Sequence, residues 1–199
     1  MIAIIDYGMG NLRSVQKAFE KAGSAAIVTQ NISDIENAKK IVLPGVGAMR
    51  PAMDKLTELG LISVIKNAIK SGKSFLGICL GFQLLFETSY EGGEVKGLGI
   101  FKGTVEKFTQ LKVPQMGWNQ IQIQQKDCVL FKDVPNSSNV YLCHSYYVKP
   151  NDETIVAATT NYGIDYCSSM CSHNVFGVQF HPEKSQAIGI KILENFIKI

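Results

Sequence analysis

The chain has 199 residues, 46% of them hydrophobic and 19% charged, which predicts one soluble domain spanning residues 1–199 with a sizeable core. Its formal net charge of +3, without a basic cluster, argues against a nucleic-acid partner. The five cysteines are odd in number and form no CxxC pair, so they indicate neither a disulfide framework nor a zinc site, and a reduced, cytoplasmic protein is expected.

The amino-terminal half alternates strand-like and helix-like segments. Residues 2–6 form an apolar run that is predicted to be a strand. Asp6 interrupts this run, and no basic region precedes it, so the segment is unlike a signal peptide. No stretch of the chain is apolar enough over sufficient length to cross a bilayer, and no membrane partner is expected. Further strands are predicted over 25–29, 40–44 and 74–78, and helices over 12–22, 48–59 and 61–70. Strands separated by helices predict a mostly parallel central sheet with helices on both faces.

The carboxyl-terminal half has a different character. Strand-like segments joined by polar or proline-containing turns are predicted over 99–108, 119–125, 139–148, 154–161 and 174–180. A last helix is predicted over 185–198, with apolar residues on one side. The pattern favours one α/β domain that carries an antiparallel extension, and it shows no internal repeat or linker.

One cysteine lies where a strand is predicted to become a helix. In the segment GICLG, Gly77 and Gly81 flank Cys79, and a helix-like stretch follows over residues 80–87. Gly-x-Cys-x-Gly has the pattern of a nucleophile elbow with cysteine in place of serine. The helix N-terminus favours a thiolate, and the N–H of Leu80 is placed to donate to an oxyanion. A small buried cysteine at the end of a strand fits the same pattern, so the motif alone leaves both interpretations open.

A cysteine nucleophile needs a base, and the chain has only three histidines. Only His181 has an acidic residue two positions away, Glu183, which an extended chain would project to the same side. Pro182 favours that extended conformation because it disfavours the α region for the residue before it. A solvated surface turn is the alternative for this segment alone. Together, the elbow and the His-x-Glu pair predict a Cys-His-Glu triad for acyl transfer.

Several segments resemble one known family over nearly the whole chain. IIDYGMGNLRSV, LPGVGA, GICLGFQLLF, KVPQMGWN, HSYYV and FGVQFHPEKSQ are similar to motifs of the class I (triad) glutamine amidotransferases. DYGMGN and MGWN are more specific, because they resemble the glutaminase subunits of imidazole glycerol phosphate synthases within that class. The resemblance implies a flavodoxin-like α/β fold.

The resemblance also implies roles for residues that match these motifs. Cys79 would be the nucleophile, His181 the general base and acid, and Glu183 the residue that orients the histidine. Val46 and Leu80 would supply the oxyanion donors. Contacts with the substrate are implied for Gly45, Gly47, Gln83, Ser145 and Tyr146. A partner interface is implied for Asn11, Met116, Gly117, Trp118 and Tyr141.

The reaction implied by the resemblance is hydrolysis of L-glutamine to glutamate and ammonia, without a metal or organic cofactor. The ammonia would pass through the interior of a separate (β/α)8-barrel cyclase, the partner in a heterodimer. That partner would make imidazole glycerol phosphate and an aminoimidazole carboxamide ribotide in histidine biosynthesis.

Two positions depart from the family pattern and keep alternatives open. Gln115 stands where the family commonly has histidine, and Met49 stands where phenylalanine is frequent. A related glutaminase that feeds a surface-sugar amidinating synthase therefore fits the sequence as well. A catalytically silent regulatory subunit is a third possibility, which the complete Cys-His-Glu set disfavours.

Overall fold

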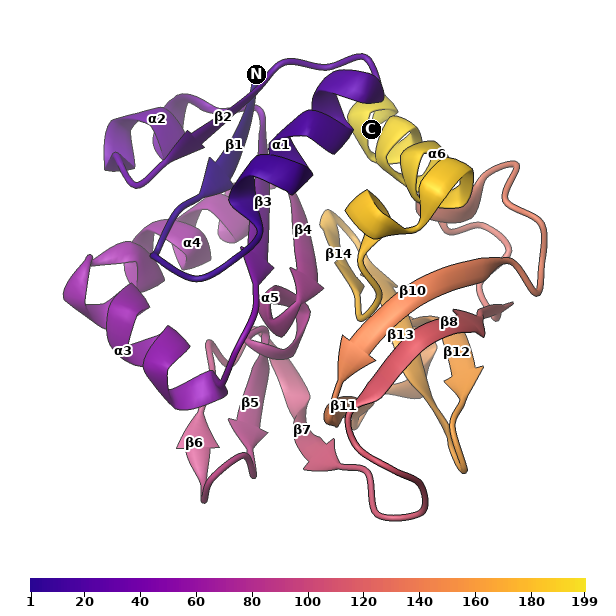
Figure 1. The fold of residues 1–199 in the computed structure, drawn as a ribbon. Helices are drawn as coiled ribbons and strands as arrows, with labels where there is room; N and C mark the ends of the chain where they lie inside the picture. Colours follow the sequence, from indigo (N-terminus) through magenta and orange to yellow (C-terminus); the bar gives the residue numbers. More distant parts are fainter.

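The computed structural model describes all residues from 1 to 199 and contains a 12-stranded sheet with helices on both faces (Figure 1). Five neighbouring strands are parallel, in the order β2 (Ala26–Thr29), β1 (Ile2–Ile5), β3 (Lys40–Gly45), β4 (Ser74–Cys79) and β14 (Val175–Val178). The expected mostly parallel sheet is confirmed in this half. The carboxyl ends of β3 and β4 lie level, because Gly45 pairs with Cys79.

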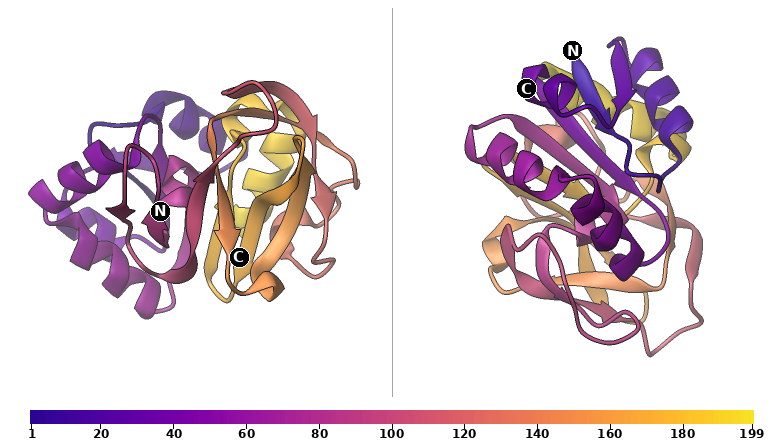
Figure 2. Two further views of the ribbon diagram at one scale, coloured as in Figure 1. Left: turned by 90° about the horizontal axis from the view of Figure 1, so that it is seen from below. Right: turned by 90° about the vertical axis from the view of Figure 1, so that its left-hand side faces the viewer.

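Helices cover the parallel strands on both sides (Figure 2). They are α1 (Leu12–Lys21), α2 (Ile32–Asn37), α3 (Met49–Glu58), α4 (Leu61–Lys70), the short α5 (Leu80–Gln83) and α6 (Gln186–Lys198). Alternate residues of β1 explain the two layers: Ala3 and Ile5 pack with α2, α3 and α4, whereas Ile2 and Ile4 pack with α1 and α6. No helix is long and apolar enough to span a membrane.

The rest of the large sheet is the expected, mainly antiparallel extension. It continues through β13 (Asp165–Ser172), β11 (Tyr146–Pro150), β7 (Phe101–Lys107), β5 (Phe86–Ser89) and β6 (Val95–Lys96). Off this path, β12 (Val156–Asn161) pairs with β13, and β9 (Gln122–Ile123) pairs with β12. A separate two-stranded sheet pairs β8 (Gln115–Gln120) with β10 (Asn139–His144). Three short 3-10 helices complete the chain: η1 (Val129–Phe131), η2 (Glu153–Ile155) and η3 (Pro182–Lys184).

The expected helix over residues 80–87 is wrong in its second half. Helix α5 ends at Gln83, and Phe86 begins strand β5. Residues 80–86 are all buried and mostly apolar, so their pattern does not distinguish a helix from a strand, and pairing of β5 with β7 decides. Asn11 precedes α1, and its side chain makes no capping hydrogen bond.

The strand expected over residues 139–148 is broken at Ser145 into β10 and β11, which belong to different sheets. The strand expected over 119–125 is also two strands, since β8 ends at Gln120 and β9 begins at Gln122. Strand β13 was not expected, because serines interrupt its apolar pattern. Ser168 and Ser169 are nevertheless buried, and their hydroxyls donate to the carbonyls of Ala158 and Gly177.

Candidate active site

Cys79 occupies a sharp turn between β4 and α5. Its φ of 55° and ψ of −110° are rare for a residue with a side chain, and such strain is typical of functional sites. The flanking glycines make the turn possible. A Cβ on Gly77 would lie 2.7 Å from the Gly81 carbonyl oxygen, and a Cβ on Gly81 would lie 1.8 Å from the Leu43 carbonyl oxygen. The two glycines therefore let α5 pass directly against β3 and β4.

Gly81→Ala is expected to lower the free energy of unfolding by about 1–3 kcal/mol or more. The alanine Cβ would collide with the backbone of Leu43, which cannot move aside. Gly60→Ala is the control, because Gly60 has a left-handed φ of 66° but no atom within 4 Å of its would-be Cβ. Chemical denaturation of both variants measures the difference. Equal destabilisation would contradict the close approach at Gly81.

His181 and Glu183 form a buried pair directly after β14. The His181 Nδ1 lies 2.8 Å from the Glu183 Oε1, and the two side chains are 5% and 1% exposed. The expected extended conformation holds for His181, with φ −98° and ψ 98°, but Glu183 lies in the 3-10 helix η3. The second Glu183 oxygen is buried without a hydrogen-bond partner. The carboxylate therefore serves the imidazole alone.

The pKa of His181 reflects its position beside Cys79. Burial lowers this pKa, but the hydrogen bonds and charges of Cys79 and Glu183 outweigh burial and raise it from 6.5 to about 10. The imidazole is therefore a cation at neutral pH. An imidazolium next to the sulfur favours the thiolate form of Cys79, which is the nucleophilic form.

A cavity of about 260 Å³ opens over Cys79 and His181. This volume is slightly below the range of about 300–1,000 Å³ usual for ligand pockets, so it suits a molecule of amino-acid size. Of the residues expected to surround a substrate or an oxyanion, the cavity wall contains Val46, Gly47, Leu80, Gln83, Ser145 and Tyr146. Gly45 is not on the wall. It is buried behind it, where a Cβ would lie 2.4 Å from the Tyr7 hydroxyl.

Two further polar groups, in or beside this cavity, were not among the predicted site residues. Glu91 lies on its wall, and the Glu91 carboxylate accepts a hydrogen bond of 2.8 Å from the Met49 N–H at the start of α3. The Tyr7 hydroxyl is buried without a partner, and burial together with the charge of Cys79 raises the pKa of Tyr7. Glu91 has no motif to mark it, whereas Tyr7 belongs to the DYGMGN segment.

A chain of amides joins the cavity wall to the nucleophile. The Gln83 Nε2 donates to the Tyr146 carbonyl and to the Gln179 Oε1, each at 2.9 Å. The Gln179 Nε2 lies 3.7 Å from the Cys79 sulfur. Gln179 is fully buried, and its one sequence signal is a polar residue inside the apolar run before His181.

His144 also lies on the cavity wall, although no acidic neighbour marked it in the sequence. Burial lowers the pKa of His144 to about 4, so this imidazole is neutral at pH 7. Its Nδ1 lies 2.7 Å from the Tyr146 carbonyl oxygen and must donate, since a carbonyl only accepts. Its Nε2 lies 3.2 Å from the Tyr166 hydroxyl, which also contacts Gln115. One cavity thus contains a cationic and a neutral histidine.

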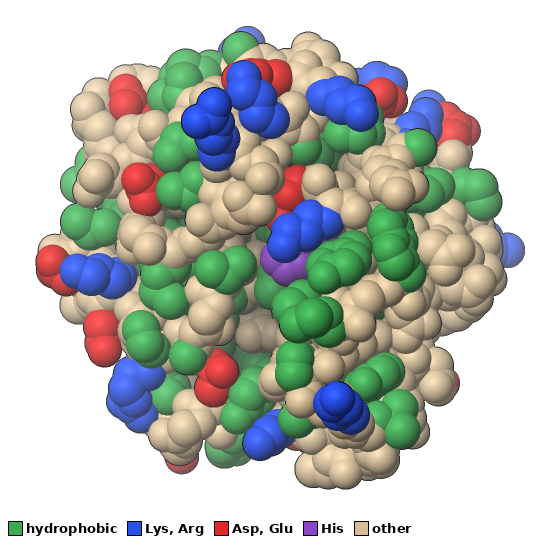
Figure 3. All heavy atoms as spheres, viewed as in Figure 1, with side chains coloured by type: hydrophobic (Ala, Val, Ile, Leu, Met, Phe, Trp, Pro, Cys, Tyr) green, Lys and Arg blue, Asp and Glu red, His purple; other side chains and the backbone are tan.

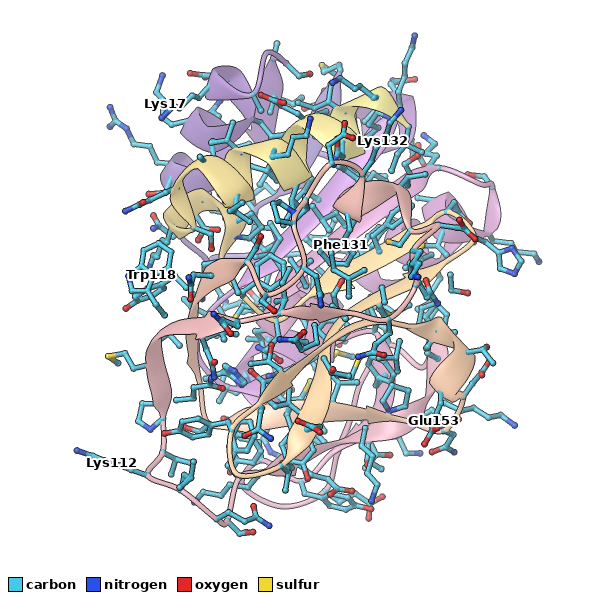
Figure 4. All side chains as sticks on the ribbon, turned by 90° about the vertical axis from the view of Figure 1, so that its right-hand side faces the viewer. Lys17, Lys112, Trp118, Phe131, Lys132 and Glu153 are labelled. Carbon is cyan, nitrogen blue, oxygen red and sulfur yellow. The ribbon has the colours of Figure 1, made fainter.

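Large apolar side chains are exposed near this site. Val46 is 43% exposed, Met116 63% and Trp118 49%. Figure 3 shows a histidine near the centre of one face, next to hydrophobic side chains, and Figure 4 shows Trp118 pointing away from β8. The Trp118 ring packs edge-on against Tyr141, with centroids 6.0 Å apart, while Asn11 and Gly117 are partly exposed. Exposed apolar side chains of this size are typical of a contact surface for another molecule.

Known proteins with similar sequences match the chain over almost its entire length. It is 51% identical over 203 residues to the imidazole glycerol phosphate synthase subunit HisH of Geobacter metallireducens, with 98% of this chain and 96% of that protein covered. It is 52% identical over 204 residues to the protein of the same name from Syntrophotalea carbinolica, with 98% of each chain covered.

Solved structures share the fold at much lower sequence identity. A crystal structure described as a glutamine amidotransferase has a TM-score of 0.78 at 17% identity, with 100% of this chain and 98% of that chain covered. PurLQS from Thermotoga maritima has a TM-score of 0.77 at 18% identity, with 99% and 97% covered. The model of the family "glutamine amidotransferase class-I" matches residues 3–199. The chain therefore belongs to the class-I glutamine amidotransferase family.

Proposed function

We propose that residues 1–199 form one glutaminase domain that hydrolyses L-glutamine to glutamate and ammonia as a subunit of imidazole glycerol phosphate synthase in histidine biosynthesis. The observation that carries this proposal is the meeting of Cys79 with the His181–Glu183 pair in one cavity. The names of relatives that are about half identical over the whole chain support the histidine pathway over surface-sugar modification. The complete triad geometry argues against a silent subunit.

The reaction begins with attack of the Cys79 thiolate on the side-chain carbonyl carbon of glutamine. A C–S bond forms, and the electron pair of the C=O bond moves to oxygen. His181 gives its proton to the amide nitrogen, which leaves as ammonia, and a thioester remains. The neutral imidazole then takes a proton from water, whose oxygen attacks the thioester and releases glutamate and the thiolate.

Two backbone N–H groups, those of Val46 and Leu80, are proposed to stabilise the oxyanion. Leu80 begins α5 immediately after the nucleophile, so its backbone N–H is one of the N–H groups at a helix start that have no acceptor within the helix. Val46 follows the last residue of β3, and β3 is paired with the strand that ends at Cys79. Loss of one such donor typically costs about 2.7–4 kcal/mol of transition-state stabilisation.

The cavity also offers groups for the amino-acid end of glutamine. Its wall includes the Glu91 carboxylate, a counter-charge for an α-ammonium group, and it includes the Ser145–Tyr146 segment. The segment faces the cavity because the chain breaks there between β10 and β11. Gln83 is tied to the Tyr146 carbonyl, so it supports this wall as well as lining it.

A cyclase subunit is the proposed heterodimer partner, and we propose that it is a (β/α)8 barrel. The exposed apolar side chains of Met116 and Trp118, with Asn11, Gly117 and Tyr141, supply the surface that it would cover. Lys184 adds a cation at this place, with its Nζ 5.6 Å from the centre of the Tyr141 ring. Transfer of ammonia inside such a complex keeps the ammonia from being protonated in water. The protein is expected to be located in the cytoplasm.

The isolated subunit is expected to be a poor glutaminase that its loaded partner activates by roughly 100–1,000-fold, the effect of gaining one oxyanion donor. Val46 precedes Gly47, whose φ is 92°, so the backbone here can take more than one conformation. Glutamate release is measured for the subunit alone, with empty partner, and with partner plus its nucleotide substrate. Equal rates in all three mixtures would show that the loop is already set. No glutamate release in any mixture would contradict the proposed function.

A further inference from the structure

The Cys79 sulfur has a second polar neighbour besides His181. The Gln179 side-chain amide lies 3.7 Å from it, and both residues are buried. This distance is within the range of an N–H···S hydrogen bond, provided that the amide presents its nitrogen to the sulfur. The orientation of the amide therefore decides what Gln179 can do.

That orientation follows from a group that can only accept. The Tyr146 carbonyl lies 2.9 Å from one end of the Gln83 amide, which must be the Nε2 end. The same nitrogen lies 2.9 Å from Gln179, so Gln179 presents its oxygen to Gln83. Its Nε2 is then the end that faces Cys79. The reverse orientation would set two nitrogens against each other and a carbonyl oxygen against the sulfur.

We propose that Gln179 is a further catalytic group of the glutaminase reaction, whose side-chain amide donates a hydrogen bond to the Cys79 thiolate. A donor at this position favours the charged form of the sulfur in a buried site. It acts twice in each turnover: before the C–S bond forms, and when that bond breaks and its electron pair returns to sulfur. Between these two stages His181 gives its proton to the leaving nitrogen and takes another from water, whereas the Gln179 amide keeps its N–H throughout.

This inference rests on the proposed function, but its first test does not require glutamine. Gln179→Met removes the donor while keeping a side chain of similar length. Alkylation of Cys79 by iodoacetamide at pH 7.5 is followed by mass spectrometry of the Cys79 peptide in the isolated subunit. We expect this rate to fall about 10-fold or more, the equivalent of losing one hydrogen bond to a charged group. Asn195→Ala is the control, because Asn195 is a buried amide that bonds the carbonyls of Leu130 and Lys132 instead.

The second test uses the complete complex with its partner and nucleotide substrate. Gln179→Met should lower kcat for glutamine by roughly 10- to 100-fold and leave KM within about 3-fold, since the amide contacts sulfur and not the substrate. If that variant does not fold, Gln83→Met replaces it in the alkylation test. This substitution removes the hydrogen bond that orients the Gln179 amide. Alkylation should then slow at least ~3-fold, less than after loss of the whole hydrogen bond to sulfur.

The proposal would be overturned if a folded Gln179→Met subunit is alkylated within about 2-fold of the wild-type rate. If Gln83→Met is the variant tested, an unchanged alkylation rate would overturn it. The same holds if Asn195→Ala slows alkylation equally, because the effect would then be general destabilisation. If the wild-type complex releases no glutamate, the glutaminase function fails, and the alkylation rates still decide the role of Gln179.

Discussion

Cys79→Ala is expected to reduce glutamine-dependent turnover of the assembled synthase by on the order of 10⁶-fold, as loss of the nucleophile does in other triad hydrolases. Turnover with added ammonia should survive, because the partner's chemistry does not use the thiol. The side chain is small and buried at the end of β4, so alanine fits the same turn. Both activities are measured on the complex of this chain with its partner.

Cys143→Ala is the matched control for that experiment. Cys143 lies on the wall of the same cavity, but it is on β10 and is not at a strand-to-helix turn. Its replacement should change glutamine-dependent turnover by less than about 3-fold, as expected for a group outside the reacting set. Glutaminase activity retained in Cys79→Ala and lost in Cys143→Ala would move the nucleophile from one cysteine to the other.

Glu183→Gln is expected to keep the fold and to lower kcat by up to about 10⁴-fold, the effect of the corresponding carboxylate-to-amide change in a triad hydrolase. An amide at position 183 can still accept from the His181 Nδ1, which now lies 2.8 Å from the carboxylate. It cannot stabilise the imidazolium as a carboxylate does. The measurement is kcat for glutamine in the activated complex, with circular dichroism as the check on folding.

The pH dependence of this variant gives an independent test. Glu183 is one of the groups that raise the pKa of His181 to about 10, so removing its charge lowers that pKa. His181 must be protonated to give a proton to the amide nitrogen that leaves as ammonia, and the alkaline limb of the kcat/KM profile should therefore move to lower pH. A profile identical to that of the wild type would contradict the role given to Glu183.

Features that depend on neighbouring residues in the chain could be read from the sequence. The parallel strands β1, β3 and β4 are short apolar runs bounded by glycine and polar turns, and no other element suits such runs between amphipathic helices. The turn at Cys79 was also predictable, because Gly77 and Gly81 are needed wherever a helix passes so close to its own strand. The His181–Glu183 contact spans two residues and is likewise local.

Features that depend on distant pairing were decided by the tertiary structure alone. Phe86 is in a strand and not in a helix because β7 pairs with it, and the chain breaks at Ser145 because β10 and β11 join different sheets. Gln179 lies beside the Cys79 sulfur, and Glu91 lies on the wall of the cavity, only through the packing of segments 100 and 12 residues away from Cys79. A side chain buried by such contacts carries no periodic signal of its own, so its partners, its pKa and its chemistry emerge only when the sheet is assembled.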